Sequence, residues 1–171
     1  MKRPIIITLI LLLGCAASVP IPKWYLNPPS KIGYRYAQGT ERGDEIQNAV
    51  DEATNLAVAE LARTTETELS GNINRVQDEV NDRTIVDKFT SAQNGVYSVA
   101  LKDWRVAKKE IVEDGGLYRA YVLVEWDEGA AQKRLMDQIK ADQDLYEAMR
   151  PTELMEEMEQ KVEEYRKRRG N

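Results

Sequence analysis

The chain of 171 residues contains no histidine and only one cysteine, and these two shortages exclude several kinds of site. Histidine is the commonest general base and the commonest zinc ligand, so the histidine-based metalloprotease motifs are impossible here. A single cysteine cannot form a disulfide within the chain. No glycine-rich phosphate loop occurs, and Ser70-Gly71 lacks the rest of a nucleophile turn. We therefore expect a protein that is not an enzyme and that uses no metal or other cofactor.

The sequence also lacks an apolar run long enough to cross a membrane. Residues 5–13 form an apolar run of nine residues that only Thr8 interrupts. Such a run fits the core of a signal peptide, about 7–15 residues, and is far short of the roughly 20 residues of a spanning helix. Lys2 and Arg3 supply the positive start, so residues 1–14 are predicted to be a signal peptide.

The only cysteine follows this run after a single glycine. Leu12-Leu13-Gly14-Cys15 resembles the bacterial lipobox, in which a lipoprotein signal peptidase cuts before the cysteine. We predict cleavage between Gly14 and Cys15 and attachment of a diacylglycerol and an N-acyl lipid to Cys15, because a thiol is nucleophilic and stable anchoring needs two or more chains. Ala16 stands where an aspartate would favour the inner membrane, so we expect an outer-membrane protein facing the periplasm or the surface. The alternative is an ordinary secreted protein in which Cys15 has no role.

An excess of acidic residues argues against nucleic acid as the partner. Removing Lys2 and Arg3 with the signal peptide leaves 22 basic and 29 acidic residues, a formal charge of 22 − 29 = −7. Phosphate backbones require a basic surface. The expected partners are the membrane, through the lipid, and other envelope proteins, with a second copy of the chain as one candidate.

The expected organisation has four parts: a signal peptide over 1–14, a lipidated proline-rich tether over 15–30, an α+β domain over 31–128 and a helical extension over 129–171. The prolines predict an extended tether, in which Trp24 either docks on the domain or lies at the lipid surface. The fold class is α+β, with a long helix packed on a small antiparallel sheet and a C-terminal helical tail.

Hydrophobic periodicity predicts the elements of the domain. A strand is expected over 32–38, ending at Gly39. A helix follows to about Arg63, opened by a capping box of Asp44 and Gln47, and three alanines on one face let it approach the sheet closely. Residues 65–80 fit either a strand or a helix, and the threonines favour a bent strand. A short helix is expected over 82–94, with Gly95 as its end.

The clearest pattern is a hairpin near the end of the domain. Residues 104–113 and 117–126 alternate, and the turn 114–116 contains two glycines that supply the positive φ of tight turns. Both faces of the second strand are largely apolar, which predicts a central strand with a helix on one side. A helix to about Met149, an interruption at Pro151 and a last helix over 152–167 complete the chain. Asp142 and Asp144 are interpreted as part of a solvated helix face.

Several stretches within residues 12–128 together form a familiar pattern. They are the lipobox, Pro22-Lys23-Trp24, Tyr36-Ala37-Gln38-Gly39-Thr40, Asp51-Glu52-Ala53, Ala59-Glu60-Leu61-Ala62-Arg63 and Tyr121-Val122-Leu123-Val124. This pattern resembles the lipoprotein-20 family of bacterial cell envelopes, which includes outer-membrane lipoproteins, surface antigens and flagellar accessory lipoproteins. The resemblance implies a long helix on an antiparallel sheet and no catalytic residues, and the acidic tail after Trp126 departs from it.

Two hypotheses about function remain besides the disfavoured enzyme. The first is a non-catalytic envelope lipoprotein that acts as a scaffold or accessory component of an outer-membrane or periplasmic assembly, including a flagellar one. The second is a module that binds a small ligand or a glycan through exposed aromatic side chains.

The tail carries a narrow apolar stripe with the spacing of a coiled coil. Its members are Met155, Met158, Val162 and Tyr165. Either this helix folds back on its own domain or the stripe binds a partner, for which methionine is well suited because it repacks easily. The stripe is therefore the candidate partner-binding site.

Overall fold

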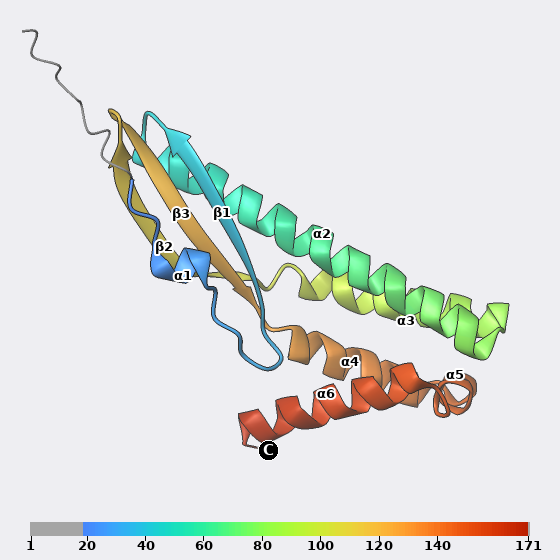
Figure 1. Cartoon of the computed structure of the whole chain (residues 1–171). Helices are drawn as coiled ribbons and strands as arrows, with labels where there is room; N and C mark the ends of the chain where they lie inside the picture. The colour runs from blue at the N-terminus through green and yellow to red at the C-terminus, as the bar shows by residue number, and fades with distance from the viewer. Residues whose placement is uncertain (1–18, 171) are drawn as a thin grey trace, which may run out of the picture.

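The computed structural model describes residues 19–170, which form an antiparallel sheet at one end and a group of helices at the other (Figure 1). The α+β class predicted from the sequence is confirmed. The elements are α1 Lys23–Leu26, β1 Arg35–Gly43, α2 Ile46–Val80, α3 Arg83–Ala100, β2 Arg105–Asp114, β3 Leu117–Trp126, α4 Glu128–Ala141, α5 Gln143–Met149 and α6 Glu153–Arg169.

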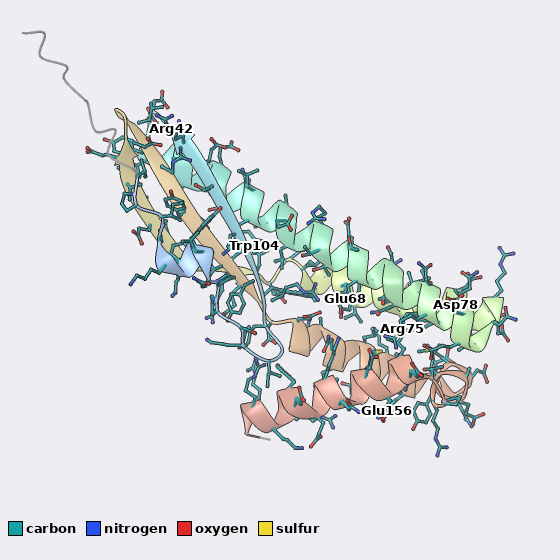
Figure 2. The ribbon with its side chains drawn as sticks, viewed as in Figure 1. Arg42, Glu68, Arg75, Asp78, Trp104 and Glu156 are labelled. Carbon is teal, nitrogen blue, oxygen red and sulfur yellow. The ribbon has the colours of Figure 1, made fainter. Side chains whose placement is uncertain are left out.

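The sheet has the strand order β1-β3-β2, with both pairs antiparallel. The hairpin is confirmed, and Gly115 and Gly116 have φ angles of 62° and 84°, as the turn requires. β3 is the central strand, as predicted, and its second half is buried on both faces. Figure 2 shows Arg42 at the hairpin end of the sheet, where its side chain donates to the Asp114 carbonyl at 2.8 Å.

The sheet packs on α2 through very small residues. Ala49, Ala53 and Ala57 are buried on the helix face, as predicted. The strand does not end at Gly39 as expected, because Gly39 lies within β1 at the point where the helix crosses it. A Cβ atom at Gly39 would lie 1.9 Å from the carbonyl oxygen of Ala53. Glycine is needed here for close approach rather than for ending the strand.

The helix itself differs from the prediction at both ends. The capping box is wrong: α2 begins at Ile46 after Glu45, which makes no side-chain cap. The bent strand over 65–80 is also wrong, because α2 continues to Val80 and ends at Asn81 in the left-handed conformation. The hydroxyl of Thr65 donates to the carbonyl of Leu61 at 2.8 Å, so its hydrogen bond is satisfied within a helix.

The second half of α2 is stabilised by α3, which returns beside it. Gln93 of α3 is fully buried and donates to the carbonyl of Leu69 at 3.0 Å. α3 does not end at Gly95 as expected but runs to Ala100, whose carbonyl accepts a hydrogen bond from the indole of Trp126 at 2.6 Å. Packing against the sheet end therefore outweighs the weak helix propensity of glycine.

The C-terminal helices belong to the same core as the rest of the chain. One cluster of buried side chains runs from Ala37 in β1 to Val162 in α6. The residues assigned to a helical extension thus complete the domain that precedes them. The predicted helix to Met149 is broken at Asp142, which caps α5 by accepting from the amide of Leu145 at 3.1 Å and pairs with Lys88 at 3.0 Å. Asp142 is therefore a capping residue and not simply part of a solvated face.

Candidate functional site

The predicted cleavage and lipidation residues, Gly14 and Cys15, lie outside the described residues. The chain is described from Val19, only four residues after the cysteine (19 − 15 = 4). Among residues 19–170, no helix is long and apolar enough to cross a membrane. The anchor assigned to Cys15 stays a prediction.

The segment that follows Cys15 is docked on the sheet rather than extended. Pro22 is buried, and the single turn α1 lies on the sheet face opposite α2 (Figure 1). The ring of Tyr25 packs edge-on against Tyr121 of β3, with the ring centroids 5.0 Å apart. The backbone carbonyl of Tyr25 accepts a hydrogen bond from the side-chain amide of Gln38. Of the two positions weighed for Trp24, the structure has the docked one, in which its indole donates to Glu110 at 3.4 Å. The predicted extended tether over residues 15–30 is therefore interrupted by the docked turn α1.

The apolar stripe of the tail is buried on its own chain. Met155, Met158, Val162 and Tyr165 are between 2% and 7% exposed, and α6 packs along α4. Tyr165 fits against Gly129, where a Cβ atom would lie 2.3 Å from its ring. The structure thus shows the alternative in which the helix folds back, and these residues are not an open partner-binding surface while α6 is docked.

An ion network joins the sheet to the helices at the centre of the molecule. The guanidinium of Arg35 in β1 donates to Glu68 of α2 and to Glu128 of α4. Glu68, labelled in Figure 2, also lies 3.6 Å from Lys161 of α6. Because these groups tie four elements together, and Arg35 and Glu128 are mostly buried, we assign them a structural role.

A second polar cluster lies on the outer face of the sheet, the face opposite α2. At its centre is Glu125 of β3, whose side chain is 5% exposed. One carboxylate oxygen accepts from the hydroxyl of Tyr36 at 2.6 Å, and the other accepts from Nε and Nη2 of Arg105, with Nε at 3.0 Å. The ammonium of Lys31 lies 4.0 Å away.

These contacts keep Glu125 ionised. Burial alone would raise the pKa of its carboxyl, but the hydrogen bonds from Tyr36 and Arg105 and the charges of Arg105 and Lys31 lower the pKa below its ordinary value. Burial, together with the Glu125 carboxylate, raises the pKa of the Tyr36 hydroxyl, which therefore stays a donor.

The cluster borders a hollow of about 450 Å³ on the outer face. Its floor includes Leu123 and Glu125 of β3, and its rim is formed by β2 and by the loop that joins α1 to β1. A second hollow of about 320 Å³ shares Arg105 and Glu125 with it and contains Asp103, Asp127 and Arg169. We name the first of these the outer-face hollow.

The sequence alone did not single out this site. Glu125 was placed in a largely apolar strand face, and Tyr36 was one of several alternating aromatics. A charged residue between Val124 and Trp126, near the end of the strand, was the only available indication.

The lowered pKa of Glu125 predicts a pH-dependent contribution to stability. A carboxyl with a lowered folded-state pKa stabilises the fold above its unfolded-state value, and this contribution is lost as the pH falls below that value, ordinarily 4.5. We expect Glu125→Gln to reduce the free energy of unfolding by about 2 kcal/mol at neutral pH, with the deficit shrinking in acid. Urea unfolding at neutral pH and again in acid measures this deficit.

Glu113→Gln is the matched control, because Glu113 is exposed on the same hairpin and makes no ion pair with the described residues. It should leave the stability at either pH unchanged. An equal deficit for Glu125→Gln at neutral and acid pH would show that the ionised carboxylate is not what stabilises the cluster.

Within residues 19–170, no group of histidine, cysteine, aspartate or glutamate side chains is placed to hold a metal ion. A scan against protein-family models, a search of curated proteins and a search of solved structures each found no match to the chain.

Proposed function

We propose that the chain is a lipid-anchored cell-envelope protein, held at the outer membrane, that acts as a non-catalytic scaffold or accessory component of an envelope assembly. The proposal rests on the lipobox pattern at Cys15 and on the docking of α1 directly after it. Pro22 is the first buried residue of the described chain, and the seven residues from Cys15 to Pro22 (22 − 15 = 7) span at most about 25 Å when extended. Lipid on Cys15 would therefore hold the folded body close to the membrane, because the linker between them is short.

The shape of the body supports this role. α2 has 35 residues, which gives a rod of about 50 Å that joins the sheet to the group of helices. Because α1 ties the chain to the sheet, the helical end would be carried at a distance from the point of attachment (Figure 1). An anchored body of this shape is suited to placing a binding surface at a set height within an envelope assembly.

The anchor is tested by replacing the cysteine in cells that express the full chain. We expect Cys15→Ala to abolish fatty-acid labelling, to leave the precursor uncut and to release the protein from the membrane fraction. Ser18→Ala is the control, because it alters a nearby small residue and leaves the lipobox intact. A Cys15→Ala protein of mature mass that still fractionates with membranes would contradict the anchor.

The assembly role has its own test. Crosslinking in intact cells that carry the wild-type chain, followed by identification of the crosslinked proteins, should recover envelope proteins. The same crosslinks should be lost in Cys15→Ala cells if the anchor positions the body.

A further inference from the structure

The outer-face hollow gathers cationic side chains from two separate parts of the chain. Arg105 and Lys108 come from β2, and Lys31 comes from the loop before β1. With Glu125 the lining carries three positive charges and one negative charge, a net of 3 − 1 = +2. This local excess stands out on a chain that is acidic as a whole.

A β-bulge brings two of these cations to the same face. Strict alternation along β2 would place Arg105 and Lys108 on opposite faces. The register shifts between Val106 and Lys108, so that Arg105 lies opposite Glu125 and Lys108 lies opposite Leu123. Glu125 and Leu123 are two residues apart on β3 and share the outer face, so the bulge aims both cations into the hollow.

Glu125 holds Arg105 in a fixed orientation. Two of the three guanidinium nitrogens, Nε and Nη2, donate to the carboxylate. Nη1 makes no hydrogen bond to residues 19–170 and remains a free donor. The Lys108 ammonium likewise has no ion-pair partner in that range. The Lys31 ammonium lies 4.0 Å from Glu125 and 5.8 Å from the centre of the Tyr34 ring, and makes no hydrogen bond to residues 19–170. Three donors are thus available to one ligand.

We propose that the outer-face hollow binds the anionic group of a small ligand, a phosphate or a carboxylate. Several cationic donors that converge on an open hollow can form charge-assisted hydrogen bonds with such a group. The apolar floor at Leu123 and the Tyr36 ring would contact the less polar part of the ligand. This proposal goes beyond the scaffold role and does not depend on lipid at Cys15.

Protection of an edge strand does not account for the arrangement. Exposed lysines on an edge discourage pairing with another chain, and β2 is an edge strand. Lys109 serves that purpose from the opposite face, since it lies opposite Val122. Lys31 is not part of β2 at all, yet it faces the same hollow as Arg105 and Lys108.

The proposal is tested by titrating the full chain in neutral detergent micelles while following its amide signals by NMR. The free probes are inorganic phosphate and glucuronate, and in a separate arm the micelles are doped with phosphatidylglycerol or, as the neutral reference, with phosphatidylcholine. We expect saturable shifts at residues 105–108 and 123–125, with a dissociation constant of roughly 1–10 mM for a free probe. Shifts with a free probe indicate a soluble ligand, and shifts with phosphatidylglycerol alone indicate a lipid headgroup.

The double variant Lys31→Gln/Lys108→Gln should weaken binding by about tenfold, because it removes two of the three cations and leaves the Arg105–Glu125 pair in place. Lys109→Gln is the matched control, since it removes one exposed lysine from the other face of the same strand. It should bind as the wild type does. Absence of saturable shifts with every anionic probe would overturn the proposal, and so would equal weakening by Lys109→Gln and the double variant.

Discussion

Gly39→Ala is expected to destabilise the fold severely. The added Cβ would lie 1.9 Å from the carbonyl oxygen of Ala53 and 2.7 Å from the amide nitrogen of Ala57. Both atoms belong to the backbone of α2, so no side-chain rotation relieves the overlap. The helix must move off the strand, and the contacts between α2 and the sheet are lost with it. We expect the free energy of unfolding to fall by about 4 kcal/mol or more, a large share of the stability of a typical domain.

Gly71→Ala, in α2 itself, provides a control for the same chemical change. Gly71 is exposed, and a Cβ atom there would meet nothing within 4 Å. Because alanine is the better helix former, this variant should be more stable than the wild type by about 0.5–1 kcal/mol. Urea unfolding followed by circular dichroism measures both variants. A Gly39→Ala protein as stable as the wild type would mean that α2 does not cross β1 at this glycine.

Truncation after Arg150 is expected to cause the second large loss of stability. The removed helix α6 contributes five buried side chains, Leu154, Met155, Met158, Val162 and Tyr165. Its removal also exposes the side of α4 that it covers, including Gly129 and the buried Met136. Each such side chain contributes about 1.5–3 kcal/mol when fully buried, so we expect the melting temperature to fall by roughly 10 °C or more.

The oligomeric state decides between the two interpretations of the tail. If α6 packs on its own chain, as the structure has it, the truncated protein should lose stability without losing any specific association. Removal of residues 170–171 alone is the control and should change neither property. An unchanged melting temperature together with a lost association would instead show that α6 acts as an arm for a partner.

The local patterns of the sequence were sufficient for the elements whose signals are local. The hairpin was found because two glycines at positive φ separate two alternating strands. The approach of α2 to the sheet was foreseen from its stripe of alanines, and the last helix from its stripe at coiled-coil spacing. In each case the element is indicated by residues that are close together in the sequence.

Tertiary structure decided where local signals were weak or contradictory. Residues 65–80 carry strand-favouring threonines, yet they are helical because the stretch packs along α3, whose Gln93 donates to the carbonyl of Leu69. Gly39 and Gly95 both looked like ends of elements, but one is a point of close contact and the other lies within a continuous helix. A glycine has the same local preference in both settings, so only its neighbours distinguish them.

The outer-face hollow depended on tertiary structure most of all. The sequence by itself determined the lipobox pattern, the lack of histidine, the acidic charge and the alternation of the strands. It did not reveal the bulge in β2, and alternation without the bulge separates Arg105 from Lys108. Nor did it show that Lys31 and Tyr36 meet Glu125, since pairing between β1 and β3 joins residues about 90 positions apart. Strand register and the packing of distant segments bring these charges together, and neither is encoded in the spacing of neighbouring residues.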